Sequence, residues 1–253
     1  MEIFDMIIDR IKLFEKMFDS MRIVDPVKKE ILRLKEGTLC RSNLECYNFW
    51  KNQEICENCI SIRASNEDKT FFKMECTVDK VYLLTAIPLI IQGEKLVVEL
   101  FKDASDSLYM QNSELGAEVK MLSAIEHMNR VQARDELTGL YNRRFIHERI
   151  PADLVRASLK NEPVSIIFTD LDYFKKINDT YGHTAGDQVL QQFAAELISH
   201  IRSGEDWAAR YGGEEFLILL TNTDINAARA VAERIRKSVA EKEFIIGDIR
   251  IHI

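Results

Sequence analysis

The chain has 253 residues, which corresponds to one large domain or two ordinary ones. Its residues are 46% hydrophobic and 30% charged, as in a globular water-soluble protein, and its longest apolar run is too short to span a bilayer. The net charge of −7 argues against electrostatic binding to nucleic acid or to an anionic membrane. We therefore expect a cytoplasmic protein whose cysteines are free thiols or metal ligands rather than disulfides.

Residues 1–105 carry the strand and helix signals of an α+β sandwich. Apolar residues recur at helical spacing from Ile3 to Phe18, which predicts an amphipathic helix at the start of the chain. A helical or irregular segment is expected over residues 38–66. Strands are expected at residues 21–26, 30–34, 70–77, 80–91 and 95–102. Two strands, a helical middle and three further strands give a sandwich with one open face.

Four of the five cysteines lie in the expected helical segment, at Cys40, Cys46, Cys56 and Cys59. A Cys-x-x-Cys pair with two further cysteines nearby suits tetrahedral zinc or an iron–sulfur cluster. The alternative is a set of buried free thiols, because cysteine packs as a small hydrophobic residue. The spacing leaves both interpretations open, whereas Cys76 lies on an expected strand and is assigned to the core.

Residues 106–134 contain no proline and one glycine, which predicts a single long helix. Leu108, Leu115 and Leu122 are seven residues apart, a spacing that offers a seam for a parallel coiled coil with a second copy of the chain. The alternative is a lone amphipathic helix packed on its own domain, because the repeat spans barely three heptads. We expect the coiled coil, and therefore a homodimer joined through this linker helix.

Residues 135–253 carry the pattern of a second domain. Helices are expected from the turn at Gly139 to about residue 160 and at residues 172–178, 189–201 and 227–239, with a loop at 180–187. Strands are expected at residues 164–170, 207–211, 216–220 and 248–253. After the first helix, the order β-α-β-β-α-β predicts the ferredoxin-like, or split βαβ, arrangement.

Two adjacent glycines, Gly212 and Gly213, predict a tight hairpin turn with Glu214 and Glu215 at its tip. In the ferredoxin-like arrangement, the strand that ends at Asp170 lies beside this hairpin. Three carboxylates from two elements repel one another unless a cation neutralises them, which indicates a hard metal ion such as Mg²⁺. Such a site suits nucleotidyl transfer. For the Gly-Gly-Glu-Glu stretch alone, a solvated acidic turn is the alternative.

Three motifs of the second domain, in the same order and spacing, resemble the GGDEF domain of diguanylate cyclases. They are Asp135-x-Leu137-Thr138-Gly139-Leu140-x-Asn142-Arg143-Arg144, Asp170-Leu171-Asp172-x-Phe174-Lys175-x-Ile177-Asn178-Asp179-x-x-Gly182-His183-x-x-Gly186-Asp187, and Arg210-Tyr211-Gly212-Gly213-Glu214-Glu215-Phe216. The resemblance covers residues 135–253. It implies condensation of two GTP into cyclic di-GMP with release of two pyrophosphates, by two domains that each hold one GTP and meet face to face.

The resemblance also implies a catalytic role for each acidic motif position. Asp170, the carbonyl of Leu171 and Glu214 would bind Mg²⁺ or Mn²⁺. Glu215 would support a second metal or help to deprotonate the 3′-hydroxyl.

The remaining motif positions would bind the nucleotide. Asn178 and Asp187 would pair with the guanine edge, a role that suits an amide and a carboxylate. Contacts to the nucleotide and its phosphates would come from Phe174, Lys175, His183, Gly212 and Gly213. His183 is equally suited to packing in the loop, and Asp172 is better suited to capping a helix than to binding metal.

Two departures from the family's pattern affect what the resemblance implies. The family's product-inhibition site has the form Arg-x-x-Asp, whereas Ser203 precedes Asp206 at the arginine position and Arg202 stands one residue early. We expect that inhibitory site to be absent or weakened. Family members also continue past the equivalent of Ile253, with a strand and helix whose basic residues bind the triphosphate. We therefore expect the chain as given to bind GTP weakly and to turn it over poorly or not at all, with Asp170 and the acidic turn still correctly formed.

Residues 1–105 resemble a PAS sensor domain more loosely, in strand order and in running directly into a signalling helix. Cys46, Cys56 and Cys59 resemble a cysteine pattern of some sensor domains attached to these cyclases. The predicted fold class is therefore α+β: a PAS-like α/β sandwich over residues 1–105, a helical linker over 106–134, and a ferredoxin-like GGDEF palm domain over 135–253 that is truncated at its C-terminus.

The function predicted from these features is a diguanylate cyclase that uses GTP and Mg²⁺ and is regulated by the N-terminal sensor. We expect no nucleic acid and no membrane as partner. One alternative is a non-catalytic module that senses GTP or cyclic di-GMP, and another is a different nucleotide cyclase on the same palm fold. The intact acidic motif favours the enzyme over the module.

Overall fold

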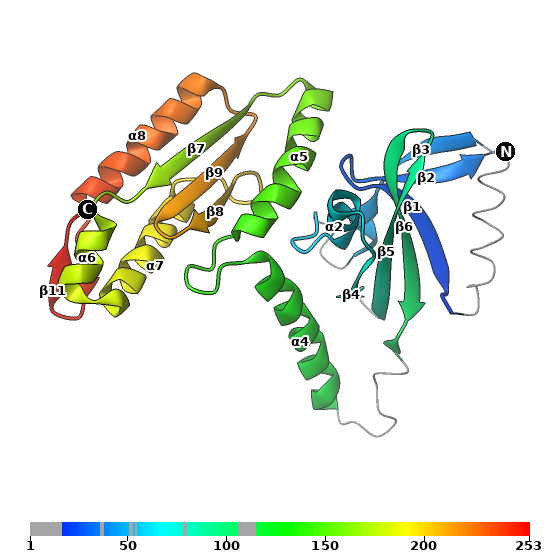
Figure 1. The fold of residues 1–253 in the computed structure, drawn as a ribbon, viewed down its shortest axis with the longest axis horizontal. Coiled ribbons are helices and arrows are strands. Elements are labelled where there is room, and N and C mark those ends of the chain that lie inside the picture. The colour runs from blue at the N-terminus through cyan, green and yellow to red at the C-terminus, as the bar shows by residue number, and fades with distance from the viewer. Residues whose placement is uncertain (1–16, 36–37, 51–52, 54, 78–79, 106–114) are drawn as a thin grey trace. The chain divides into compact units, whose positions relative to one another are not determined.

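The structure is a computed structural model that describes residues 17–35, 38–50, 53, 55–77, 80–105 and 115–253 (Figure 1). The chain divides into two compact units, residues 1–132 and residues 133–253. The predicted amphipathic helix at the start of the chain lies outside the described residues, apart from its last two positions. Both units combine strands and helices, which confirms the α+β class.

The described part of unit 1 forms one six-stranded antiparallel sheet with the strand order β3-β2-β1-β6-β5-β4. Its strands are β1 (Ser20–Asp25), β2 (Glu30–Lys35), β3 (Thr38–Glu45), β4 (Phe71–Cys76), β5 (Val81–Ile91) and β6 (Glu94–Asp103). The 3₁₀ helix η1 (Cys46–Phe49) and the helix α2 (Ile60–Glu67) lie between β3 and β4. The five predicted strands are confirmed.

The main core of unit 1 lies between α2 and the sheet. Ile60 and Ala64 of α2 pack against Val24, Leu84 and Val97, all of them almost fully buried. The predicted turn between the last two strands is also confirmed, with Ile91 paired to Glu94. Gln92 and Gly93 both have positive φ, 53° and 84°, which is the backbone of a two-residue type I′ turn.

Residues 38–45 form the strand β3, so the expectation of a helical or irregular segment beginning at residue 38 was wrong. Strand β3 pairs with β2 in the register Arg33 to Cys40, and the Ser42 hydroxyl donates to the Ile31 carbonyl at 2.6 Å. The free edge of β2 supplies backbone partners for this segment, and such tertiary pairing outweighs weak local preference. Among the described residues of this segment, η1 and α2 are the helical part.

Helix α4 (Leu115–Ala133) occupies the second half of the predicted linker helix. Its side chains are described from Ser123 onward, so Leu108 and the side chains of Leu115 and Leu122 lie outside what the structure describes. Ile125 is 3% exposed and packs against Cys76 and Val81. The described end of α4 is therefore held against the sheet of unit 1.

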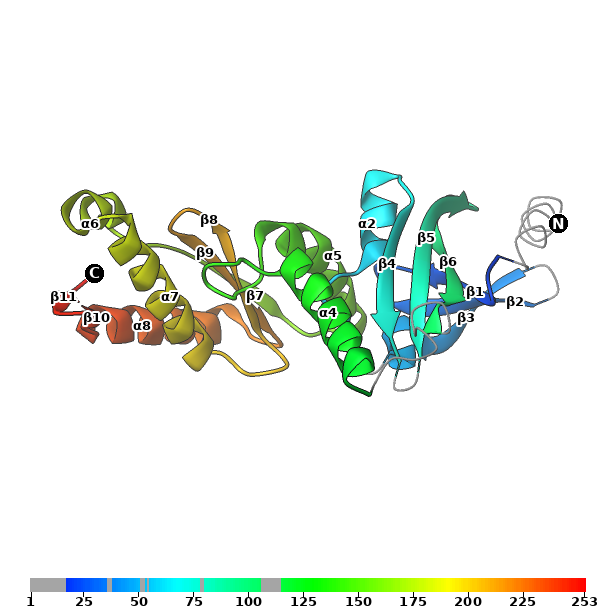
Figure 2. The ribbon, with the colours of Figure 1, turned by 90° about the horizontal axis from the view of Figure 1, so that it is seen from below.

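Unit 2 contains a three-stranded antiparallel sheet with the order β7-β9-β8 among its described residues. Its elements are α5 (Arg143–Lys160), β7 (Val164–Asp170), α6 (Phe174–Tyr181), α7 (His183–Ser199), β8 (Trp207–Gly212), β9 (Glu215–Thr221), α8 (Ile225–Glu241), β10 (Phe244–Ile246) and β11 (Ile249–Ile251). Helices α7 and α8 cover one face of the sheet and α5 covers the other (Figures 1 and 2).

Strand β9 is buried on both faces because it runs through the middle of this sheet. Phe216 and Ile218 point into the core beneath α7 and α8, whereas Leu217 and Leu219 pack towards α5. This alternation is the two-residue period of a strand. It fixes the register of β9 against both neighbours, because a one-residue slip would exchange the two faces.

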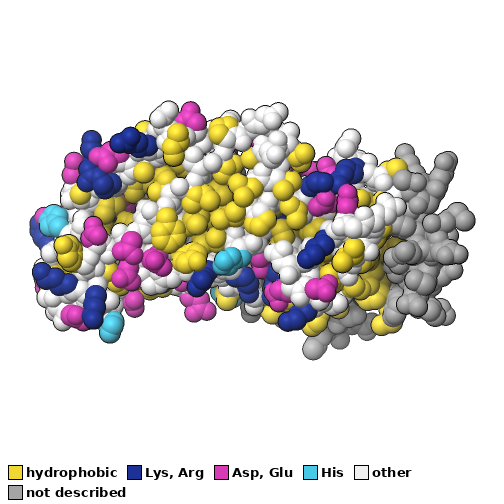
Figure 3. Space-filling model, turned by 45° about the horizontal axis from the view of Figure 1, so that its top comes forward, with side chains coloured by type: hydrophobic (Ala, Val, Ile, Leu, Met, Phe, Trp, Pro, Cys, Tyr) yellow, Lys and Arg dark blue, Asp and Glu magenta, His cyan; other side chains and the backbone are white. Residues whose placement is uncertain are grey.

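Strand β7 is covered less completely on the side of α5. Ile166 and Phe168 are 47% and 51% exposed, although they pair with Leu219 and Leu217 of β9. Helix α5 contacts β8 at the opposite edge of the sheet, which leaves β7 uncovered on that side. Hydrophobic side chains are accordingly visible on the surface of the molecule (Figure 3).

Two local predictions for unit 2 were wrong. Residues 183–187, expected in a loop, form the first turn of α7, and only Gly182, with a φ of 85°, separates it from α6. The expected last strand, residues 248–253, does not join the main sheet. Instead β11 pairs with β10, because Gly247 has a φ of 57° and turns the chain back on itself. The sheet therefore contains three of the four strands of the predicted β-α-β-β-α-β order.

Candidate functional site

The acidic residues predicted to form the site meet at one end of the unit 2 sheet. Asp170 is the last residue of β7 and Glu215 is the first residue of β9, and the two are directly paired in the antiparallel register. Directly opposite residues in such a pair have Cβ atoms about 4.5–5.5 Å apart and project from the same face. Like charges at that separation destabilise the pair, so the site favours a cation beside it.

The glycine turn brings Glu214 next to this pair. Gly212 is paired with Glu215, so Gly213 and Glu214 form the two-residue connection, and Gly213 has a φ of 53°. A residue with a Cβ is strained in that conformation, which explains glycine at this position. Both glycines are exposed and both glutamates are half-buried. The turn therefore leaves its backbone open to a ligand while it fixes the two carboxylates.

A chain of hydrogen bonds anchors this turn to the loop at the start of unit 2. The Arg210 guanidinium donates to the Gly213 carbonyl at 2.9 Å and to the Asp135 carboxylate at 3.2 Å. The Asp135 carboxylate also accepts from the backbone N–H and the hydroxyl of Thr138, at 2.9 and 2.7 Å. Burial opposes ionisation of Asp135, but the Thr138 and Arg210 interactions outweigh it and lower its pKa. Asp135 therefore stays charged and positions Arg210.

The two residues predicted to read guanine lie on the neighbouring helices α6 and α7, which pack against each other. Asn178 lies on α6 and Asp187 lies on α7, one residue after Gly186. A Cβ added to Gly186 would lie 2.0 Å from Asn178 Oδ1 and 3.1 Å from Phe174 Cζ. The glycine therefore allows the Asn178 side chain to lie directly against α7, at the residue before Asp187.

The other predicted nucleotide-binding residues divide into exposed and buried positions. Lys175, His183 and Asp187 are exposed. The side chain of Phe174 is 7% exposed and that of Leu171 is 4% exposed, and both belong to the core of unit 2. A nucleotide can therefore meet Phe174 and Leu171 through their backbone atoms, which agrees with the carbonyl role expected of Leu171.

The side chains predicted to bind metal are not assembled into a complete ligand set among the described residues. Within the described part of the chain, no three His, Cys, Asp or Glu side chains are grouped so that they could hold one metal ion. The carboxylates of Asp170 and Glu214 with the Leu171 carbonyl form an oxygen donor set of the kind that Mg²⁺ prefers. That donor set stays a prediction.

The cysteines of unit 1 are placed in different surroundings. Cys40 lies on β3, and Cys59 accepts a hydrogen bond from Lys29 Nζ at 3.3 Å. Burial raises the pKa of Cys46 far above its usual value, and burial raises that of Cys56 to about 11. Both are therefore protonated thiols at neutral pH in this structure, and a metal at Cys46 or Cys56 would have to displace the proton. Zinc or an iron–sulfur cluster at these residues stays a prediction.

Sequence reasoning missed the residues that position the site. Arg210 and Asp135 were recognised as motif members, but their contact could not be predicted because they lie 75 positions apart. Gly186 was likewise recognised without its contact to Asn178. Arg202 forms an ion pair with Asp206 at 2.7 Å and also donates to the Thr221 carbonyl, so it supports the start of the hairpin.

Comparison with known proteins agrees with this geometry. Residues 132–250 match the family model described as diguanylate cyclase, GGDEF domain, so unit 2 is a GGDEF domain. Response regulator PleD of Caulobacter vibrioides is 43% identical over 123 residues, which are 49% of this chain and 27% of that protein. Diguanylate cyclase A of Treponema denticola is 53% identical over 94 residues, 37% of this chain and 25% of that protein.

A solved structure of the coiled coil and GGDEF domain of DgcB from Caulobacter crescentus, in complex with c-di-GMP, aligns with a TM-score of 0.49. It is 28% identical, and the alignment covers 54% of this chain and 72% of that one. The chain spans about a quarter of the length of the two curated relatives named above. None of the helices in the described ranges is long and apolar enough to cross a membrane.

Proposed function

We propose that unit 2 is a diguanylate cyclase that condenses two GTP molecules into cyclic di-GMP. The observation that carries this proposal is the pairing of Asp170 with Glu215 beside the Gly213–Glu214 turn. It is supported by the match of residues 132–250 to the GGDEF family and by relatives that are named diguanylate cyclases. Asn178 on α6 and Asp187 on α7 would recognise guanine.

Each group in the site has a task in this reaction. Asp170, Glu214 and the Leu171 carbonyl would hold Mg²⁺, which when bound neutralises phosphate charge and lowers the pKa of the attacking hydroxyl. Glu215 would accept the proton of the 3′-hydroxyl, because its carboxylate lies opposite Asp170. The exposed backbone of Gly212 and Gly213 would let the phosphates approach closely. Lys175, exposed in the first turn of α6, would place its charge near them.

The product contains two nucleotides, so two GTP-loaded domains have to meet. We propose that two copies of the chain associate through the linker helix, as the leucine spacing indicates. A change in unit 1 would then alter how the two cyclase domains face each other.

Unit 1 is proposed to be a PAS-like sensor. What supports this is the strand order β2-β1-β6-β5-β4 within its sheet, with α2 packed on one face. The added edge strand β3 is a departure from the five strands predicted. A sensor role also agrees with the direct connection from β6 into the segment that leads to α4.

The cyclase proposal is tested by incubating the purified full-length protein with GTP and Mg²⁺ and separating the products by chromatography. We expect cyclic di-GMP, and we expect Asp170→Ala and Glu214→Ala to abolish it. Asp248→Ala, in the exposed turn between β10 and β11, is the matched control and should keep the activity. Unchanged rates in Asp170→Ala or Glu214→Ala would overturn the assignment of the site.

The same experiment separates the alternatives that the sequence left open. A non-catalytic module would bind GTP tightly in calorimetry and give no product. Another nucleotide cyclase would give a cyclic mononucleotide or a mixed dinucleotide. The intact acidic turn favours catalysis over both.

A further inference from the structure

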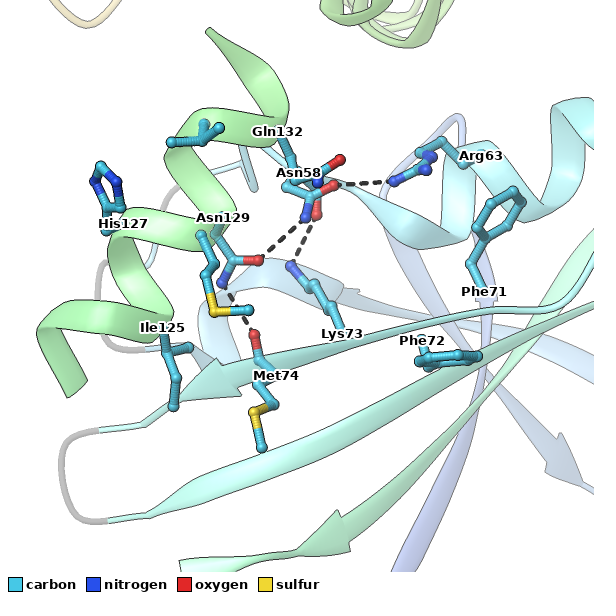
Figure 4. A pocket seen from close by; sticks show the side chains of 12 residues that line it. Asn58, Arg63, Phe71, Phe72, Lys73, Met74, Ile125, His127, Asn129 and Gln132 are labelled. Carbon is cyan, nitrogen blue, oxygen red and sulfur yellow. Dashed lines mark hydrogen bonds between the residues drawn. The ribbon is translucent and has the colours of Figure 1, made fainter. Parts of the chain in front are cut away.

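Unit 1 contains a cavity of about 470 Å³ between helix α4 and the sheet (Figure 4). One wall is formed by α4, through Ile125, Met128 and Asn129. The other wall is formed by β4 and α2, through residues that include Phe71, Lys73 and Arg63. A cavity of this size lies within the range of about 300–1,000 Å³ that is usual for small-molecule sites.

The charged groups in the cavity wall are cationic. Arg63 and Lys73 are among the twelve lining residues, and none of these lining residues is Asp or Glu. Lys73 is 8% exposed and donates to the Glu75 carboxylate at 2.6 Å and to the Asn58 carbonyl at 2.8 Å. Burial lowers the pKa of Lys73, but the ion pair and hydrogen bond with Glu75, joined by the Cys56 thiolate once that thiol ionises at high pH, outweigh it and raise that pKa. The ammonium therefore remains protonated inside the protein.

The cavity also presents aromatic surface. The Arg63 guanidinium lies 4.5 Å from the centre of the Phe71 ring. Phe72, 74% exposed, lies on the same strand, and Figure 4 shows both rings on the sheet side of the cavity. A planar apolar group can therefore pack against phenylalanine while a charged group attached to it meets Arg63 or Lys73.

Two amide side chains connect the walls. The Asn129 side-chain amide of α4 donates to the backbone carbonyl of Met74 in β4 at 2.9 Å, and the Asn58 side-chain amide donates to the side-chain Oδ1 of Asn129 at 3.1 Å. These bonds, together with the buried Ile125, hold α4 against β4. A molecule in the cavity would touch both sides of this junction.

We propose that this cavity binds a small organic anion with a planar apolar body, of the aromatic carboxylate class. The cationic and aromatic lining argues for an anion over a cation or a wholly apolar ligand, and the position of the cavity makes the ligand a bridge between α4 and the sheet of unit 1. Bound ligand adds contacts to both walls and so stabilises α4 in its docked position. Binding to this cavity does not depend on the proposed cyclase function of unit 2.

Binding is tested with 2-naphthoate and its neutral analogue 2-naphthamide, using saturation-transfer NMR and calorimetry on the full-length protein. We expect saturable binding of 2-naphthoate and at least about tenfold weaker binding of 2-naphthamide, because the charge-assisted hydrogen bond is lost. Arg63→Gln should weaken 2-naphthoate about tenfold, whereas the exposed Arg33→Gln on β2 should leave its affinity unchanged.

A second pair of variants guards against misfolding of Arg63→Gln. Met128 is 63% exposed in the α4 wall, so its replacement does not disturb the core. Met128→Glu should weaken 2-naphthoate about threefold or more by charge repulsion, and Met128→Gln should not. Hydrogen exchange of the α4 amides in residues 123–132 should slow when 2-naphthoate is bound.

Several results would overturn the proposal. One is the absence of saturable 2-naphthoate binding at about 1 mM, and another is equal affinity of the protein for 2-naphthoate and 2-naphthamide. The proposal would also fail if both Arg63→Gln and Met128→Glu left the affinity for 2-naphthoate unchanged, or if binding of 2-naphthoate left hydrogen exchange of the α4 amides unchanged. Failure of cyclic di-GMP synthesis, with these binding results intact, would count against the cyclase and not against the ligand site.

Discussion

Gly186→Ala tests how the proposed guanine site is built. The added Cβ would lie 2.0 Å from Asn178 Oδ1 and 3.0 Å from Asn178 Cγ, far inside van der Waals contact. The Asn178 side chain has to rotate away, since it can move more easily than the α7 backbone. The variant should therefore fold, but with Asn178 displaced from its position against α7.

The cost can be estimated for binding and for stability. Loss of a neutral hydrogen-bonding partner costs about 1 kcal/mol, which weakens GTP binding about fivefold. Alanine in place of a helical glycine stabilises a protein by about 0.5–1 kcal/mol where there is room. In wild-type surroundings, the clash with Asn178 removes that gain.

The assay is a double-mutant cycle with Asn178→Ala, followed by GTP calorimetry and by urea unfolding. In the Asn178→Ala background the new Cβ has room, apart from a 3.1 Å contact to Phe174 that must relax slightly. Gly186→Ala should then leave GTP affinity unchanged and raise the free energy of unfolding. Equal, additive losses of GTP affinity in the two backgrounds would refute the reasoning.

Three further predictions concern other parts of the chain. Arg210→Gln should lower the rate of turnover about tenfold or more, because Gly213 and Asp135 lose a charged partner. The control Arg229→Gln, on the exposed face of α8, should keep the wild-type rate, and equal rates in Arg210→Gln and the wild type would exclude a positioning role for Arg210. Burial raises the pKa of Cys56 from its usual value near 9 to about 11, so this thiol should account for roughly 2–3 kcal/mol of a fall in the free energy of unfolding between those pH values. Cys46, whose pKa burial also raises, should add to the fall, so Cys56→Ala should show a smaller fall than the wild type in urea unfolding, and an equal fall in the two proteins would contradict this. Leu115→Glu combined with Leu122→Glu should give monomers in sedimentation and abolish turnover, and surviving dimers would place the interface elsewhere.

Much of the site could be predicted because it depends on local signals and on one topological rule. The strand before Asp170 and the hairpin around Gly213 follow from apolar runs and a glycine turn. Their pairing follows from the ferredoxin-like order, which places the first strand beside the third. The register that sets Asp170 opposite Glu215 then needs only the two-residue alternation of β9.

The contacts that support the site could not be predicted, because they depend on how elements far apart in the chain pack. The Asp135–Arg210 ion pair and the fit of Asn178 against Gly186 are of this kind. The errors in secondary structure have the same origin. Strand β3 forms because β2 offers a free edge, and β11 turns back on β10 instead of entering the main sheet.

The most direct test of the account is the product formed from GTP and Mg²⁺ by the chain extended with the C-terminal GGDEF segment of a relative, measured beside the same protein carrying Asp170→Ala. We predict cyclic di-GMP from the extended protein, even at a low rate, and none from its Asp170→Ala variant. GTP bound by the extended dimer without any cyclic di-GMP, or the same yield from Asp170→Ala, would contradict the assignment of unit 2 as a diguanylate cyclase with Asp170 in its active site.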